Sequence, residues 1–85
     1  MQVSKLLRHV LLEQGLSARE LARRLNTSGP NIAQKLGRDN WSVSDLAAIA
    51  AALGCGFSVS FHLPDGQTMT AEQTAPTSDT NTHTT

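Results

Sequence analysis

Apolar residues recur at helical spacing over most of the first 54 positions, and the spacing then changes to that of a strand. From about Val3 to Gln14, apolar residues three and four positions apart predict an amphipathic helix that Gly15 ends. After Ser42, which we expect to act as N-cap with Asp45 in a capping box, the same spacing predicts another helix that ends at Gly54. The inward residues of these two helices are Leu6, Leu7, Val10 and Leu11 in the first, and Val43, Leu46, Ile49, Ala50 and Leu53 in the second.

The segment between them predicts two short helices joined by a tight polar turn. Ser17 and Glu20 are spaced as a capping box that begins the first of these helices. Residues 26–29, Asn-Thr-Ser-Gly, compete for backbone hydrogen bonds or relax the backbone, so the helix is expected to end there. Ser28 caps the second helix, and Pro30 is tolerated in its first turn because no intrahelical donor is lost at that position.

The second short helix has one apolar side and one polar side. Ile32 and Leu36 turn toward a core, which leaves Asn31, Gln34 and Lys35 facing outward. Amide side chains bond bidentately to adenine, and lysine reaches guanine acceptors or phosphate, so a helix of this kind suits a DNA major groove. The two short helices therefore predict a helix-turn-helix.

Two segments carry a resemblance to a known family. GLSARELARRLNTSGPNIAQKL and SVSDLAAIAAALG resemble the Cro-repressor-type helix-turn-helix regulators of phages and mobile elements, over about residues 5 to 54. A shorter segment, FHLPDG, resembles small members of this family whose chain ends in a β-strand or hairpin. The resemblance implies a DNA-binding domain, with double-stranded DNA as its partner.

Base contacts are expected from the second helix of the motif. Gln34 lies one turn into this helix and is the first candidate for reading a base. In the resembled family the helix often opens with glutamines or other polar residues, whereas Gly29 and Pro30 stand at those places here. Backbone and a proline ring can contact a thymine methyl but carry little hydrogen-bond code for the bases. The expected base-contact residues are Ser28, Gly29, Pro30, Asn31, Gln34 and Lys35.

Phosphate contacts are expected on both sides of that helix. The start of the first motif helix presents amide groups and a helix dipole that favour an anion. The family often carries a glutamine near this start; Ala18 or Arg19 falls there, and only Arg19 offers a charge-assisted replacement. The expected phosphate-contact residues are Ser17, Ala18, Arg19, Arg38 and Asn40.

The charges are divided along the chain although their sum is zero. All seven lysines and arginines lie within the first 38 positions, where two acidic residues oppose them, and five acidic residues follow. This division separates a part that can meet phosphates from a part that phosphates would repel. Arg23 and Arg24 are further candidates for phosphate contacts; the alternative is that they pair with Glu20 or lie in solvent. Trp41 is interpreted as a packing residue, with its indole nitrogen as the alternative phosphate donor.

After Gly56 apolar and polar residues alternate, so the hydrophobic period is two residues, as in a β-strand. The alternation predicts a half-buried strand with Phe57, Val59, Phe61 and Leu63 on one face. Pro64-Asp65-Gly66 predicts a turn that pairs Phe61 with Met69 in a hairpin. A two-stranded hairpin is marginal by itself and its apolar edge is exposed. We therefore hypothesise that these four apolar residues dimerise the chain through strand pairing with a two-fold mate; the alternative is a hairpin folded onto its own helices.

The predicted fold class is mainly α, with a four-helix helix-turn-helix domain followed by a short C-terminal β-hairpin used for dimerisation. The predicted boundaries are 1–56 for the DNA-binding domain, 57–70 for the hairpin and 71–85 for a disordered tail. The tail is assigned because Thr, Ser, Asn, Gln, Asp and Pro dominate it and cannot bury enough surface to offset ordering entropy. Either the hairpin or the tail is a candidate surface for a protein partner.

Other classes of protein find little support in the residues. No apolar run approaches the roughly 20 residues needed to span a bilayer, and no signal-peptide pattern opens the chain. A lone Cys55 fits a reducing cytoplasm and forms no intramolecular disulfide. His9, His62 and His83 have no second ligand at metal spacing, so neither a metal, another cofactor nor an enzyme is expected.

The sequence thus predicts a cytoplasmic, bacterial or phage-encoded regulator that binds DNA in a sequence-specific way. The favoured form is a dimeric repressor that occupies a palindromic operator. The alternative is an antitoxin-like or adaptor module that uses the same fold to bind a protein.

Overall fold

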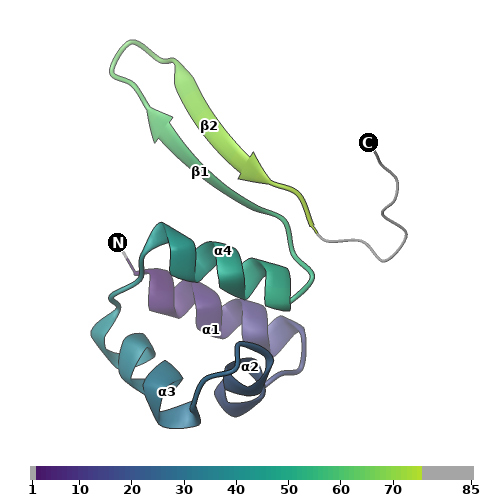
Figure 1. The fold of residues 1–85 in the computed structure, drawn as a ribbon. Helices are drawn as coiled ribbons and strands as arrows, with labels where there is room; N and C mark the ends of the chain where they lie inside the picture. The colour runs from purple at the N-terminus through teal and green to yellow at the C-terminus, as the bar shows by residue number, and fades with distance from the viewer. Residues whose placement is uncertain (1, 76–85) are drawn as a thin grey trace.

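Four helices are followed by a two-stranded antiparallel hairpin (Figure 1). The computed structural model of the chain describes residues 2–75. The elements are α1 Val3–Glu13, α2 Ala18–Arg24, α3 Gly29–Arg38, α4 Val43–Ala52, β1 Phe57–His62 and β2 Thr68–Gln73. This arrangement confirms the predicted mainly helical class with a C-terminal hairpin.

Three of the helices begin at a serine N-cap. The hydroxyls of Ser17, Ser28 and Ser42 each accept a hydrogen bond from the amide three residues later, at 3.0, 3.2 and 3.0 Å. Asp45 completes the predicted capping box of α4 by accepting from the Ser42 amide. The box predicted for α2 is only half formed, because the Glu20 carboxylate turns toward the arginines of the next turn instead of the Ser17 amide.

The core lies between the four helices. Leu21 of α2 is its largest fully buried side chain, with 1% of its surface exposed. Leu6 and Val43, which the helical spacing predicts as inward, are exposed instead. Each lies at the margin of its helix's apolar stripe, where no neighbouring helix covers it. The buried apolar residues of the cluster are Leu7, Leu11, Leu21, Ala22, Ile32, Leu36, Ile49 and Leu53.

The connector between α3 and α4 is fastened to the start of α1. Asp39, in a left-handed conformation with φ +53°, accepts a hydrogen bond of 2.7 Å from the amide of buried Ser4. The Ser4 hydroxyl in turn accepts from the Trp41 indole nitrogen at 2.9 Å. Trp41 therefore packs against the core, as interpreted from the sequence, and its indole N–H has a partner within the protein.

The hairpin follows the predicted register. Phe61 pairs with Met69, and the Leu63 amide donates to the Gln67 carbonyl at 2.7 Å. Gly66 takes the left-handed place in the turn, with φ +94°. The base of the hairpin is joined to α4, because the Gln73 side-chain amide donates to the Ala47 carbonyl at 3.0 Å. Its turn points away from the helices (Figure 1).

The boundary predicted between hairpin and tail is wrong by three residues. Ala71, Glu72 and Gln73 continue β2, where they pair with Val59, Ser58 and Phe57. Backbone pairing with β1 orders this polar stretch, which its composition alone could not indicate. The rest of the predicted tail, from residue 76, lies outside the described residues.

Candidate nucleic-acid interface

The turn between α2 and α3 sets the two helices of the motif at their angle. The Thr27 amide donates to the Ala22 carbonyl at 2.9 Å, which closes the end of α2. Asn26 adopts φ +58°, a left-handed conformation that asparagine tolerates better than most residues. Four residues therefore separate the two helices, and the last of them, Ser28, is the N-cap of α3.

Helix α3 presents the predicted apolar and polar sides. Ile32 and Leu36 are buried against the core, whereas Asn31 and Gln34 are exposed. The Asn31 side-chain amide donates to the Thr27 hydroxyl at 2.7 Å, which orients it at the start of the helix. Of the remaining base-contact candidates in the first turn, Ser28 and Pro30 are exposed and Gly29 is half-buried.

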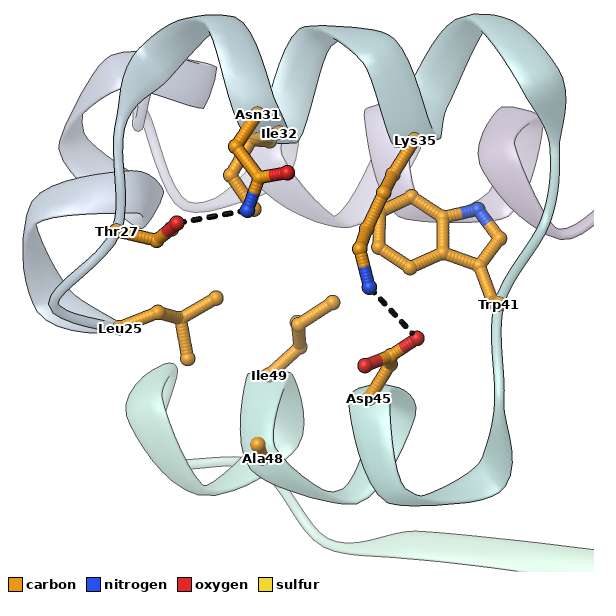
Figure 2. A pocket seen from close by; sticks show the side chains of 9 residues that line it. All are labelled: Leu25, Thr27, Asn31, Ile32, Lys35, Trp41, Asp45, Ala48 and Ile49. Carbon is orange, nitrogen blue, oxygen red and sulfur yellow. Dashed lines mark hydrogen bonds and ion pairs between the residues drawn. The ribbon is translucent and has the colours of Figure 1, made fainter.

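Lys35 is placed differently from the expectation that it faces outward. Its ammonium group lies 3.0 Å from Oδ2 of Asp45 on α4 and 5.9 Å from the centre of the Trp41 ring (Figure 2). A hydrogen bond from the Ser42 amide, and after it the one from Lys35, hold the pKa of the Asp45 carboxyl below its ordinary value. Lys35 is thus occupied within the protein, while its role as a base contact stays a prediction.

Most of the polar candidates around α3 line one hollow. Its volume is about 320 Å³, and it lies between α3 and the connector that leads to α4. Backbone and side chains of these elements therefore offer amide donors, amide acceptors and a guanidinium within one surface depression. The lining residues are Asn31, Gln34, Lys35, Arg38, Asn40, Ser42 and Asp45.

The start of α2 holds the other predicted phosphate contacts. Ser17 and Arg19 are exposed and Ala18 is half-buried. None of the three lines the hollow beside α3. Phosphate contact remains a prediction both for these three residues and for Arg38 and Asn40 in the hollow. Arg23 donates to the Glu20 carboxylate at 2.6 Å and Arg24 lies 3.9 Å from it, while 75% and 42% of the two arginine side chains stay exposed. Contact of either arginine with phosphate stays a prediction.

Residues 2–75 contain neither a group of metal-ligating side chains nor a membrane-spanning helix. No group of three His, Cys, Asp or Glu residues among them is arranged to hold a metal ion. In the same range, every helix is too short or too polar to cross a bilayer.

A comparison with known protein families identifies the family of the chain. The Cro/C1-type HTH DNA-binding domain matches residues 6–58, more than half of the chain. The chain belongs to this family. The match covers all of α2, α3 and α4 and ends at the second residue of β1, so most of the hairpin lies beyond it. No curated protein and no solved structure matches the chain significantly.

Membership of the Cro/C1-type family makes this a DNA-binding helix-turn-helix protein with double-stranded DNA as its partner. Sequence reasoning found the exposed amides of α3 but missed the contribution of Asp45. The capping-box spacing identified Asp45 as a cap of α4 and gave no sign that it also binds Lys35, ten residues earlier on another helix.

Proposed function

We propose that this Cro/C1-type protein is a dimeric repressor that reads a palindromic operator with α3. The observation that carries the proposal is the exposed pair of amide side chains, Asn31 and Gln34, in one hollow with Arg38 and Asn40. Amides supply base-specific hydrogen bonds in the major groove, while a guanidinium supplies charge for the flanking phosphates. Both kinds of group are needed for sequence-specific binding.

The residues divide into two roles along α3. Gln34, exposed and one turn into the helix, is assigned to a base edge. Asn31 donates one amide proton to Thr27 and keeps its carbonyl oxygen and second proton for an adenine. Arg38 and Asn40, at the end of α3 and just beyond it, are assigned to phosphates, and Ser17, Ala18 and Arg19 at the start of α2 to the opposite strand.

The hairpin is assigned to dimerisation. Phe61 and Met69 face each other across the strands on one face, and 74% and 59% of their surfaces are exposed. In the described chain β1 pairs with β2 alone, so the backbone groups on its outer edge are open to a second copy. Two α3 helices related by such an interface would enter successive major grooves about 34 Å apart. Occupation of a promoter by this dimer would exclude other proteins from it.

Selection of bound sequences from a random DNA pool tests the proposal. The expected result is an enriched, two-fold symmetric sequence whose binding weakens as salt is raised. On that sequence Gln34→Ala should cost about 1–3 kcal/mol and relax preference at one base position. Gln2→Ala is the matched control, because the exposed Gln2 side chain makes no capping bond at the start of α1.

Two outcomes would contradict parts of this assignment. An equal loss on every sequence would show that Gln34 contacts the DNA backbone. Enrichment of an asymmetric, single site would contradict the palindromic operator and the two-fold dimer.

A protein-binding role is the second candidate, and the exposed apolar hairpin favours it. This surface lies mostly outside the part of the chain that matches the DNA-binding family. An antitoxin-like or adaptor protein would use Phe61 and Met69 to hold a different protein. If the chain showed no salt-sensitive DNA binding and remained a monomer, this function would be favoured over that of a repressor.

A further inference from the structure

The ion pair between Lys35 and Asp45 crosses the groove between α3 and α4 (Figure 2). The pair lines a hollow of about 210 Å³, where Leu25, Ile32 and Ile49 supply apolar walls. It also lines the polar hollow assigned to DNA, and the two hollows share Asn31, Lys35 and Asp45. The pair therefore stands at the border between the core and the DNA-binding surface.

Asp45 is held in place independently of Lys35. The same carboxylate oxygen, Oδ2, accepts from the Ser42 amide at 3.0 Å and from the Lys35 ammonium group at 3.0 Å. The Asp45 amide also donates to the Ser42 hydroxyl, so the residue is fixed at both its backbone and its side chain. Lys35 is thus drawn to a preorganised acceptor, and its flexible stem lies beside the Trp41 ring.

This placement changes the charge that α3 offers to DNA. With Lys35 neutralised, the polar hollow presents the neutral amides of Asn31 and Gln34, and Arg38, which makes no ion pair within the described residues. Attraction between cations and phosphates strengthens binding to every sequence alike, whereas amide contacts to bases distinguish between sequences. A lysine withheld from phosphates therefore lowers the sequence-independent part of the binding.

We propose that Asp45 is a specificity-determining residue, whose carboxylate holds the Lys35 ammonium group away from DNA so that α3 discriminates mainly through its amides. Asp45 itself acts as a positioning residue, because its effect passes through Lys35. This inference rests on the proposed function, in which α3 reads base edges.

Binding of Asp45→Asn to the selected operator and to unrelated duplex DNA, over a range of salt concentrations, tests the proposal. Asparagine keeps an acceptor oxygen for the Ser42 amide and removes the charge that holds Lys35. We expect affinity for unrelated DNA to rise about three-fold, and log K to fall more steeply with log salt by about 0.9, the slope of one phosphate contact. The ratio of operator to unrelated affinity should fall. An unchanged slope would overturn the proposal.

The Lys35→Met variant distinguishes an effect of Asp45 that passes through Lys35 from a direct repulsion between the Asp45 carboxylate and phosphates. In the Lys35→Met background, Asp45→Asn should leave the slope unchanged. If it raises affinity for unrelated DNA as much as in the original chain, the carboxylate acts by direct repulsion and the proposal is wrong. Ser42→Ala is the matched control for the helix cap, because it removes the hydroxyl acceptor and keeps the carboxylate with both of its hydrogen bonds.

A measurement without DNA distinguishes failure of this proposal from failure of the proposed function. The pKa of Asp45, followed by NMR during a pH titration, should rise in Lys35→Met because one of its two charged-state hydrogen bonds is lost. An unchanged pKa would show that the ion pair does not form in solution. A normal rise together with no DNA binding would instead refute the proposed function and leave the pair as a purely structural contact.

Discussion

The helical part of the molecule and its hairpin are stabilised in different ways. In the helices, leucines and isoleucines far apart in sequence share one core, and Asp39, Ser4 and Trp41 join the connector to α1. In the hairpin the contacts are mostly between its own two strands, and its distal apolar residues, Phe61 and Met69, remain exposed. The stability of the helices therefore depends on tertiary packing, while that of the hairpin depends mainly on its turn and on the pairing of its two strands.

This difference suits the two parts to different functions, DNA binding for the helices and assembly with a second chain for the hairpin. A surface that reads DNA needs side chains held by a rigid scaffold, and α3, which we propose as that surface, is anchored in the core by Ile32 and Leu36. A hairpin with an open edge and an exposed apolar face is suited to gain stability from a second chain. Substitutions in the two parts should accordingly have separate effects.

Truncation of the core should have the largest effect. Leu21→Ala truncates the largest fully buried side chain and should lower the free energy of unfolding by about 2–5 kcal/mol. Urea denaturation followed by circular dichroism measures it. Met69→Ala, on the exposed hairpin face, should change monomer stability by no more than about 0.5 kcal/mol. Equal losses would show that the hairpin is part of the core.

A charge on the hairpin should affect assembly and leave the helices intact. Phe61→Lys should weaken dimerisation by at least about ten-fold, since it places a cation where the aromatic ring is expected to be buried by the second copy. Sedimentation at micromolar concentration measures it, with the thermal unfolding of the helices as a check. Thr70→Lys, on the other face and on β2, is the control. An intact Phe61→Lys dimer, or an original chain that is monomeric at this concentration, would refute the hairpin interface.

The turn of the hairpin should respond more weakly. Gly66→Ala should destabilise the hairpin by about 1–2 kcal/mol, because alanine at φ +94° is strained although its Cβ meets nothing within 4 Å. NMR of the cross-strand contacts measures this, and the melting of the helices should not change. Gly37→Ala, inside α3 with ordinary backbone angles, should instead be neutral or stabilise by up to about 1 kcal/mol. A loss of helical stability in Gly66→Ala would show that the two parts unfold together.

The smallest effect concerns the pH dependence of the helical part. The lowered pKa of Asp45 contributes stability that is present above the ordinary carboxyl pKa of about 4 and is lost as pH falls through the lower folded-state value. Because the group is partly exposed, the contribution should be less than about 1 kcal/mol. Denaturation midpoints between pH 2 and 7 should therefore fall less in Asp45→Asn than in the original chain. Parallel curves would contradict the role of the ionised carboxylate.

Much of the fold is determined by local patterns in the sequence. Serine caps, apolar residues at helical spacing and the Pro64–Gly66 turn each act over a few residues, so the four helices and the Phe61–Met69 register could be predicted. The same local logic placed Asn31 and Gln34 on the outer face of α3. Local patterns erred where a neighbour competed, as when Arg23 and Arg24 drew Glu20 away from its expected cap.

Tertiary structure decided the contacts between residues that are distant in sequence. Asp39 caps the start of α1 across 35 positions, and Lys35 turns from the expected DNA face to Asp45 on another helix. The helical period predicts the face of the helix on which a residue lies. It does not predict where a long lysine side chain places its charge, which can reach a neighbouring element. By itself the sequence determined where α3, the helix proposed to face DNA, begins and which amides it displays. Only the packing of α3 against α4 decided which of its charges remains available, because that depends on the distance between two helices.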